Sequence, residues 1–421
     1  MTYKQAREYI SSLLKFGIKP GLETTAGLLS RLGNPQDKLK YVHIAGTSGK
    51  GSTAAMIYEA LRAAGQSAGM YTSPYVLDFR ERIQINGHMI SKPALCGAAA
   101  AVMAAAARPP RLDITEFEAI TAAAFLCFAE AGCDIVVLET GLGGRLDATN
   151  VIKQPECALI TSLGLDHIDI LGGDIESIAY EKCGIIKGGV CVSYPQPYTS
   201  AARKIAAIAA GRSARLVLPD MGALKDVCCE LGESEFVYKD RRYRTAMMGE
   251  HQVYNALCAI EVCGVLGLEA GAAARGIAAA ALTARAEILK KEPPFVMLDG
   301  AHNADKIGAL CDAVRPFLPV GKAIFVLGML ADKDIGGALG SIAPLAQHII
   351  TVKVNSPRTL SAAALRREAL KVTDEVTAAE SYSGALRLAR DIQARSGLPV
   401  IITGSLYLAA SMRRKAMDIF K

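Results

Sequence analysis

Short apolar runs rich in Val and Ile alternate along most of the chain with longer Ala- and Leu-rich stretches. The short runs predict strands, the longer stretches predict helices, and their alternation is typical of βα units around a mainly parallel sheet. Strands are predicted at Tyr41–Ala45, Ser67–Tyr71, Asp134–Leu138, Ala158–Ser162, Phe295–Leu298, Ala323–Leu327, His348–Val354 and Val400–Thr403. The pattern therefore predicts an α/β protein.

The chain also shows one candidate domain boundary. Its 421 residues exceed what one compact core usually holds. Near residues 280–294 an Ala-rich helix gives way to the charged, proline-bearing stretch 290–294, and a fresh strand–helix series begins at Phe295. We therefore predict a larger N-terminal domain of residues 1–284 and a smaller, Rossmann-like C-terminal α/β domain of residues 285–421.

Composition and charge exclude several classes of protein. Hydrophobic residues make up 51% and charged residues 21%, which is ordinary for a globular protein and unlike a disordered or fibrous one. The net charge of +6 is spread along the chain, aromatic residues are only 6% and Trp is absent, which argues against nucleic-acid binding. No apolar run suits a membrane span or a secretory signal. We expect a cytoplasmic protein that binds neither nucleic acid nor membrane.

The eleven cysteines lack the pairing and spacing of a disulfide framework or a zinc site. We interpret them as reduced and mostly buried thiols.

The strongest motif lies between a predicted strand and a predicted helix at Thr53–Ala64. It reads Gly46-Thr47-Ser48-Gly49-Lys50-Gly51-Ser52-Thr53. Glycines let backbone N–H groups close around a phosphate, Lys50 adds positive charge, and the Ser52 hydroxyl can ligate Mg²⁺. Ile44 stands where the general spacing asks for the first glycine. The motif still predicts a nucleotide loop and a P-loop ATPase-like N-terminal domain.

Acidic and histidine side chains follow several predicted strands. Glu139 ends one strand and precedes the glycine-rich stretch 141–147, while His167 follows the next strand. In the C-terminal part Asp299 and His302 again follow a strand. Because the carboxyl ends of parallel strands share one edge of a sheet, such groups collect there, and carboxylates suit Mg²⁺. Taken singly, a surface strand end or a helix cap explains Glu139 or Asp299 equally well.

Taken together and in this order, the motifs resemble those of the Mur ligase superfamily, and more narrowly the folylpolyglutamate synthase and dihydrofolate synthase family. The resemblance covers nearly the whole chain. Its motifs are Gly17–Glu23, His43–Ser52, Thr72–Pro74, Phe79–Gly87, Glu116–Glu118, Glu139–Asn150, Asp166–His167, Glu181–Lys187, Gly249–Ala256, Asp299–Asn303 and Asp332–Asp334.

The resemblance implies a set of site residues. The residues implied to bind ATP are Gly46, Thr47, Ser48, Gly49, Lys50, Gly51, Ser52, Thr53, Asn255, Arg285, Asp299 and His302. Those implied to hold Mg²⁺ are Ser52, Glu139, His167 and Lys182, the last as a carbamylated lysine. Lys50, Lys182 and His167 are the implied catalytic residues, and Ser73, Pro74, Phe79 and Arg82 are implied to bind folate. A monovalent cation is left open as a further cofactor.

The resemblance also implies an activity, namely ATP-dependent ligation of L-glutamate to a reduced folate or to dihydropteroate through an acyl phosphate. It implies a monomer that closes its two domains around the nucleotide. The chain departs from the family pattern at three places. Tyr75 stands where His is common, Thr140 where Val is frequent, and Leu282-Thr283-Ala284 where Trp-Pro-Gly usually precedes the linker arginine.

Three alternatives to a folate ligase remain open at this level. One is a muramyl-peptide ligase that acts on a UDP-linked substrate, although the stretch before the loop is short for a UDP-binding domain. The second is a nucleotide-gated switch that hydrolyses ATP without ligation. The third is a degenerate scaffold, which would be expected to have lost some of the charged residues of the motifs.

Overall fold

The computed structural model describes residues 1–17 and 19–421, so Ile18 of the first family motif lies outside the described residues. The chain forms two compact units. Unit 1 comprises Met1–Lys225, Val237–Tyr243 and Tyr254–Ala280, and unit 2 comprises Asp226–Phe236, Arg244–Val253 and Ala281–Lys421. Residues 226–236 and 244–253, which the sequence pattern placed in the N-terminal domain, thus belong to unit 2.

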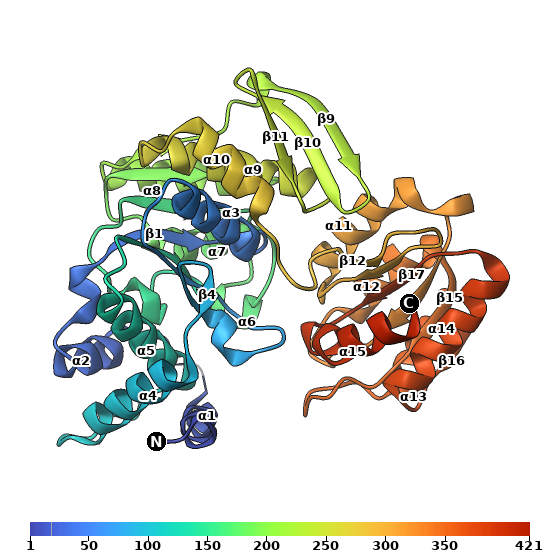
Figure 1. The fold of residues 1–421 in the computed structure, drawn as a ribbon, viewed down its shortest axis with the longest axis horizontal. Coiled ribbons are helices and arrows are strands. Elements are labelled where there is room, and N and C mark those ends of the chain that lie inside the picture. Colours follow the sequence, from blue (N-terminus) through green and yellow to red (C-terminus); the bar gives the residue numbers. More distant parts are fainter. Residues whose placement is uncertain (18) are drawn as a thin grey trace. The chain divides into compact units, whose positions relative to one another are not determined.

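Unit 1 is built on a sheet in the order β4-β3-β2-β5-β1-β6-β7-β8, in which the pairs from β2 to β8 are parallel. Figure 1 labels β1 and β4 of this sheet. Its strands are β1 (Lys40–Ala45), β2 (Ala68–Tyr71), β3 (Ile83–Ile85), β4 (His88–Met89), β5 (Ile135–Glu139), β6 (Cys157–Ile160), β7 (Val190–Ser193) and β8 (Arg215–Val217). The antiparallel strands β3 and β4 were not predicted, because both are very short and half polar.

Helices of unit 1 cover the sheet and build its cores. They are α1 (Tyr3–Ser12), α2 (Glu23–Arg31), α3 (Lys50–Ala63), α4 (Lys92–Ala107), α5 (Glu116–Glu130), α6 (Ile168–Leu171), α7 (Ile175–Lys182), α8 (Thr199–Gly211), most of α9 (Glu250–Val265) and α10 (Ala270–Ala279). The largest core joins α1, α2, α4 and α5 to the sheet, and a second core joins α7 and α8 to β6 and β7. Helix α3 packs between the sheet and α10.

Unit 2 holds a second sheet, in the order β12-β13-β17-β14-β15-β16, with only the β12–β13 pair antiparallel. Its strands are β12 (Glu287–Lys290), β13 (Val296–Leu298), β14 (Ala323–Leu327), β15 (Ala346–Thr351), β16 (Val376–Ala378) and β17 (Val400–Thr403). Its helices are α11 (Ala304–Val314), α12 (Ile335–Ile342), α13 (Ala362–Ala369), α14 (Tyr382–Ser396) and α15 (Leu406–Ile419). Strand β12 lies inside the segment that was interpreted as a link.

A separate antiparallel sheet in the order β11-β10-β9 consists of β9 (Leu224–Glu230), β10 (Glu233–Tyr238) and β11 (Arg241–Thr245). The sequence pattern did not predict it, because β9 is exposed along most of its length and carries no clear apolar alternation. Short 3₁₀ helices complete the fold. They are η1 (Leu13–Phe16), η2 (Pro35–Lys38), η3 (Phe79–Arg82), η4 (Ala148–Val151), η5 (Cys183–Ile185), η6 (Met221–Ala223), η7 (Arg315–Phe317), η8 (Pro319–Gly321) and η9 (Ala343–Leu345).

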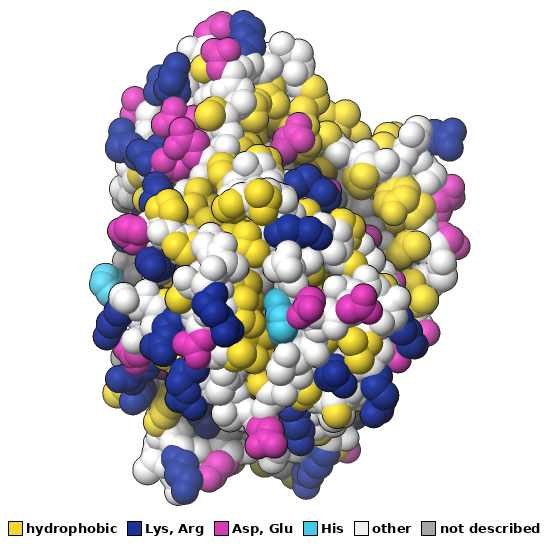
Figure 2. Space-filling view, turned by 90° about the vertical axis from the view of Figure 1, so that its right-hand side faces the viewer, with side chains coloured by type: hydrophobic (Ala, Val, Ile, Leu, Met, Phe, Trp, Pro, Cys, Tyr) yellow, Lys and Arg dark blue, Asp and Glu magenta, His cyan; other side chains and the backbone are white. Residues whose placement is uncertain are grey.

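The mixed α/β architecture with a parallel-rich N-terminal sheet confirms the predicted fold class. Each predicted strand has a counterpart, with ends that differ by a few residues. Figure 2 shows one face of the molecule, on which Lys and Arg side chains are interspersed with Asp and Glu. None of the helices in the described part of the chain is both long and apolar enough to cross a bilayer.

The contact between α3 and α10 gives a first prediction. A Cβ atom at Gly276 would lie 2.2 Å from the Ala60 backbone nitrogen, so a side chain there forces the two helices apart. We expect Gly276→Ala to lower the free energy of unfolding by about 2 kcal/mol, as overpacking does. The matched control is Gly97→Ala in α4, where a Cβ meets no atom within 4 Å, and which should stabilise the helix by about 1 kcal/mol. Urea unfolding of both variants checks this, and equal effects would contradict it.

Candidate active site

The phosphate loop Gly46–Gly49 follows β1 directly, between the neighbouring strands β5 and β6. The amides of Thr47 and Ser48 donate to the Ser162 carbonyl at 2.9 and 3.1 Å. A Cβ at Gly46 would lie 1.8 Å from the Thr161 hydroxyl oxygen, so only glycine fits there. The loop ends at the start of α3, whose free N–H groups and dipole favour an anion.

Gly49 is the second loop position that requires glycine. Its φ is +85°, and a Cβ would lie 2.4 Å from the side-chain oxygen of Asn255 in α9. Asn255, which is predicted to bind ATP, is almost fully buried. The loop is therefore packed against both β6 and α9.

Two lysines converge on the same atom of this loop. Lys50 and Lys182 each donate to the Gly46 carbonyl oxygen at 3.0 Å. Lys182, at the end of α7, is only 5% exposed, and Lys50 lies 3.9 Å from a carboxylate oxygen of Glu139. Two ammonium groups at one oxygen repel each other in a buried setting. The loop thus concentrates positive charge beside the backbone that is shaped for phosphate.

Glu139 ends β5 beside the phosphate-loop strand, in register with Ile44 of β1. It is 3% exposed, and its other carboxylate oxygen accepts a hydrogen bond from the Ser73 amide at 3.2 Å. Ser52 lies in the first turn of α3 and is also buried. A carboxylate and a hydroxyl beside a phosphate loop fit Mg²⁺, which takes one or two protein oxygens together with phosphates and water. The described residues hold no cluster of three His, Cys, Asp or Glu, and Mg²⁺ needs none.

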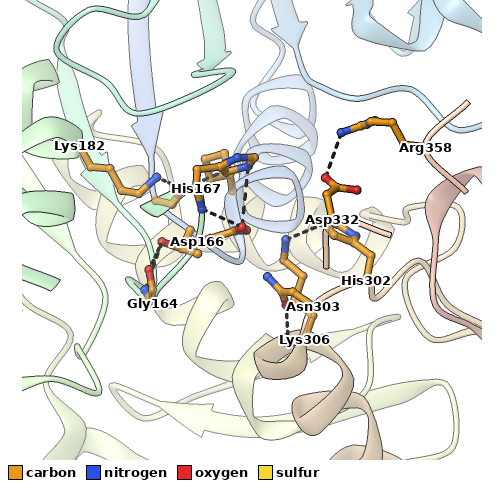
Figure 3. A network of polar contacts seen from close by, with 12 residues as sticks. Gly164, Asp166, His167, Lys182, His302, Asn303, Lys306, Asp332 and Arg358 are labelled. Atoms are coloured by element: carbon orange, nitrogen blue, oxygen red, sulfur yellow. Dashed lines mark hydrogen bonds and ion pairs between the residues drawn. The ribbon is translucent and has the colours of Figure 1, made fainter. Parts of the chain in front are cut away.

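The segment that carries His167 is tied to the phosphate loop. The Thr47 hydroxyl donates to the Gly164 carbonyl and accepts from the Gly164 amide, both at 3.1 Å. His167 itself has a left-handed backbone (φ +53°), and its Nε2 lies 3.9 Å from a carboxylate oxygen of Asp166 (Figure 3). Its side chain is half exposed.

The glycine-rich turn after Glu139 is held by the buried carboxylate of Asp147. One oxygen accepts from the amides of Gly141 and Leu142, and the other accepts from the Thr149 hydroxyl at 2.6 Å. Since that hydroxyl donates to Asp147, the Nε2–H of the buried His43 donates to Thr149 at 2.9 Å. Burial and then the charge of Lys187 lower the pKa of His43 to about 3, which keeps it neutral.

Sequence reasoning missed His43 and Thr149 as supports of this turn. Their only signal was a single histidine within an apolar strand. This signal is ambiguous, because such a histidine is more often a buried structural residue than a ligand-binding one. Burial raises the pKa of the Asp147 carboxyl, while its hydrogen bonds with Thr149, Leu142 and Gly141 act in the opposite direction and favour the charged form.

The end of the same turn packs tightly against the Lys182 helix. The Arg145 amide donates to the Glu181 carbonyl at 2.7 Å, and its guanidinium pairs with the Glu181 carboxylate at 2.8 Å. A Cβ at Gly144 would lie 2.6 Å from the Lys182 carbonyl, and one at Gly184 would lie 2.3 Å from Arg145. This contact fixes the end of α7 and with it the position of Lys182.

The loop predicted to bind folate begins beside Glu139, through the Ser73 amide. The Ser73–Pro74 peptide bond is cis, and the Thr72 amide donates to the Arg82 carbonyl, which closes the loop at its base. Phe79 is buried and packs edge to face with Tyr75 at 5.5 Å between ring centroids. Arg82 is 9% exposed, with its guanidinium 5.3 Å from the centre of the Phe79 ring.

In unit 2, Asp299 orders the segment around Arg285. Its carboxylate accepts from the Ala301 amide at 2.6 Å and from the Ala286 amide at 2.7 Å, so it is a backbone anchor and does not cap α11, whose cap is Asn303. Ala284 and Ala286, on either side of Arg285, both have left-handed backbones (φ +56° and +46°). Ala284 occupies the position where the family usually has glycine, so a conformation that suits glycine is kept without it.

His302 also follows β13, and both of its ring nitrogens are engaged. Figure 3 shows His302 next to Lys306. Nδ1 donates to the Gly300 carbonyl at 2.8 Å, and Nε2 accepts from the Lys306 ammonium at 3.2 Å. Burial first, and then the Lys306 charge, lower the pKa of His302 to about 3. His302 is therefore neutral, and Lys306, Arg285 and Lys333 supply the positive charge around it.

Comparison with known proteins decides which family this architecture represents. Residues 44–263 match the Mur ligase middle domain, and residues 284–406 match the Mur ligase, glutamate ligase domain. The dihydrofolate synthase/folylpolyglutamate synthase of Bacillus subtilis (strain 168) is 35% identical, over 98% of this chain and 99% of its own length. The chain belongs to the folylpolyglutamate and dihydrofolate synthase family.

Further relatives agree with this assignment. The folylpolyglutamate synthase of Lacticaseibacillus casei is 34% identical to this ligase, with 98% of each chain covered. The crystal structure of Mycobacterium tuberculosis folylpolyglutamate synthase complexed with ADP and AMPPCP superposes with a TM-score of 0.88 at 30% identity, over 97% of this chain and 99% of the other. The predicted family is confirmed, and the protein is an ATP-dependent ligase.

The alanine at position 284 gives the prediction for this site. A left-handed backbone strains an L-residue by about 1 to 2 kcal/mol, and glycine relieves this strain in the folded state. Glycine also has more conformational entropy in the unfolded state, which offsets part of the gain in stability. We expect Ala284→Gly in this ligase to raise the free energy of unfolding by about 1 kcal/mol. Ala363→Gly, at an exposed position of α13, should lower it by about 1 kcal/mol. Urea unfolding checks both, and a destabilised Ala284→Gly variant would contradict the assigned strain.

Proposed function

We propose that this ligase joins the amine of L-glutamate to a carboxylate of a reduced folate, and that dihydropteroate is a second acceptor. One observation carries the proposal. The Ser73 amide binds Glu139, so the aromatic loop that contains Tyr75 and Phe79 begins directly beside the charged phosphate loop. An aromatic substrate bound on that loop would present its carboxylate where ATP is activated. The Bacillus subtilis relative is named for both reactions, and the Lacticaseibacillus casei relative is named for folylpolyglutamate synthesis.

The reaction needs two group transfers. A substrate carboxylate oxygen attacks the γ-phosphorus of ATP, the bond to the β-phosphate oxygen breaks, and ADP leaves. The glutamate amine then attacks the acyl carbon, loses a proton, and inorganic phosphate departs from the tetrahedral intermediate. A free carboxylate is a poor electrophile, so the first step supplies the leaving group. Lys50 and the amides of the phosphate loop would neutralise the charge that develops on the phosphoryl oxygens.

Magnesium is part of this proposal. Glu139 and Ser52 are the proposed direct ligands, and His167, whose segment is tied to Thr47, is a further candidate. When bound, Mg²⁺ would offset phosphate charge and orient the γ-phosphoryl group.

We further propose that Lys182 is carbamylated in the active enzyme. As an ammonium, Lys182 competes with Lys50 for the Gly46 carbonyl. A carbamate replaces one of these two positive charges by a negative one, which removes the repulsion and adds an oxygen ligand for metal. A monovalent cation stays open as a further cofactor.

The remaining sequence-based assignments stay predictions. Asn255, Arg285, Asp299 and His302 are proposed nucleotide contacts, with the qualification that a neutral His302 contributes no charge of its own. A monomeric state, a cytoplasmic location and the absence of nucleic-acid and membrane partners are likewise expected.

The first test measures ADP release from MgATP and L-glutamate with different carboxylates. Tetrahydrofolate, dihydropteroate, a UDP-muramyl substrate and no carboxylate are compared in parallel. We expect stimulation by tetrahydrofolate and by dihydropteroate, and near silence without a carboxylate. Release that is equally fast without any carboxylate would exclude ligation, and stimulation by the UDP-muramyl substrate alone would replace the folate assignment.

Paired lysine variants locate the activity at the phosphate loop. Lys50→Ala should lower turnover at least a hundredfold, which is the scale for removing one stabilising charge from a transition state. The free energy of unfolding of Lys50→Ala should stay close to that of wild type, because one loop charge contributes little to stability. Lys40→Ala, at the exposed start of β1, is the control and should retain full turnover.

The modified lysine has its own prediction. Lys182→Ala should lose most activity because the carbamate is absent, and added short carboxylates such as acetate or formate should restore part of it. Lys187→Ala is the comparison variant. Lys187 donates to the carbonyls of Asn150 and Ile152 and serves structure, so added carboxylate should not restore any activity lost there. Intact-mass evidence of an unmodified Lys182 in fully active enzyme would contradict the carbamate.

A further inference from the structure

Two arginines lie on the same pair of aromatic rings in the loop after Ser73. The guanidinium carbon of Arg7, from α1, lies 4.0 Å from the centre of the Phe79 ring and 5.7 Å from that of Tyr75. The guanidinium carbon of Arg82 lies 5.3 and 5.4 Å from the same two centres. Arg7 also donates to the Tyr75 hydroxyl at a long 3.5 Å. Cation–π contact favours this arrangement, and a guanidinium next to a ring can still donate its remaining N–H groups to an acceptor.

The carboxylates of this loop do not compensate these charges. Asp78 is engaged by Arg80, whose guanidinium donates to it at 2.8 and 3.1 Å. Glu81 accepts the backbone N–H groups of Val76, Leu77 and Asp78 at 2.7 to 3.0 Å. The loop acids thus hold its backbone and one other arginine.

Each of the two arginines has a buried side-chain nitrogen that lacks a hydrogen-bond partner. The Nε atoms of Arg7 and Arg82 are buried without a hydrogen-bond acceptor, and Arg82 as a whole is more than nine-tenths buried. Among residues 1–17 and 19–421, neither arginine forms an ion pair. Two uncompensated guanidinium groups next to aromatic rings form a site for an anion that carries an apolar or aromatic part.

We propose that Arg7 and Arg82 bind the α-carboxylate of the glutamyl residue that the folate substrate already carries. This inference rests on the proposed function and adds Arg7, which no sequence motif marked, as a residue that determines substrate specificity. Tyr75 and Phe79 hold the two guanidinium planes, and the α-carboxylate accepts their N–H groups.

The chemistry of the substrate selects this group. A folate monoglutamate has two carboxylates, of which the γ-carboxylate reacts, so the α-carboxylate is the anion left for recognition. It belongs to the same residue as the reacting group, and the loop is joined to Glu139 of the phosphate site through Ser73. Dihydropteroate has a single carboxylate, which is the reacting one. The arginine pair would therefore favour the addition of a glutamate to an existing glutamyl tail and leave the first addition unaffected.

The test is a double-mutant cycle that changes protein and substrate separately. Equilibrium binding and KM are measured for tetrahydrofolate and for its α-carboxamide, with wild type and with Arg7→Met. We expect wild type to bind the amide at least tenfold more weakly, because a charge-assisted hydrogen bond is lost. Arg7→Met should bind tetrahydrofolate at least tenfold more weakly, and it should discriminate the amide less than threefold. Additive losses would overturn the proposal.

Three controls separate recognition from loop shape. Lys4→Met removes an exposed charge from the same helix, where Lys4 pairs only with Glu8 at the surface, and it should change neither constant. The KM for ATP should stay within twofold of wild type in Arg7→Met. The KM of Arg7→Met for dihydropteroate should also stay within twofold of wild type. If this KM rises as much as the KM for tetrahydrofolate, Arg7 only shapes the loop, and the proposal is overturned.

Misfolding of the variant and failure of the proposed function can each be distinguished from failure of this proposal. If thermal unfolding shows that Arg7→Met is not folded, Arg7→Lys replaces it. Arg7→Lys keeps the charge without the planar fork and should lose part of the discrimination between acid and amide. If wild type adds glutamate to neither tetrahydrofolate nor dihydropteroate, the proposed function fails. The binding measurement still decides the carboxylate site, because equal affinity of wild type for the acid and the amide excludes it.

Discussion

The packing of the phosphate loop against its neighbours is the constraint on which the site of unit 1 depends. Gly46 fits against Thr161, directly after β6, and Gly49 fits against Asn255 of α9, only because neither glycine has a side chain. That fit turns the Gly46 carbonyl toward Lys50 and Lys182 and leaves the N–H groups at the start of α3 directed to a ligand. A bulkier residue at either glycine would move the lysines and the amides together.

Buried polar contacts carry this geometry outward from the loop. Asp147 fixes the turn after Glu139, and the Arg145–Glu181 contact fixes the end of α7. A carboxylate that accepts several N–H and O–H groups can stay charged in the interior, whereas the same group without them would be protonated or unstable. The proposed metal ligand Glu139 and the candidate carbamate Lys182 are therefore positioned by residues that need not touch substrate.

Unit 2 uses the same device around Arg285. Asp299 accepts the amides of Ala286 and Ala301, and Ala286 has a left-handed backbone. Ala284, which is also left-handed, is held by other contacts, since its amide donates to Glu287 and its carbonyl accepts from the Gly300 amide. Where the family pattern has the glycine of Trp-Pro-Gly, Ala284 adopts a left-handed conformation that suits glycine better. Burial and the charge of the neighbouring Lys306 lower the pKa of His302, so this motif residue is neutral.

Contiguous residues were enough to predict the α/β class, the strands that lead into motifs, the phosphate loop and the family. Those features are local, since a strand period, a glycine-rich turn and a charged strand end each lie within a few neighbouring positions. The strands β3, β4 and β9 were not predicted, because they are short or exposed and bury too little apolar surface to produce a recognisable hydrophobic pattern in the sequence. Only the tertiary structure joined His43 to Thr149, Lys182 to Gly46 and Arg7 to Phe79. Each of these pairs is far apart in sequence, and packing of whole elements, which no local pattern encodes, decides which side chains meet.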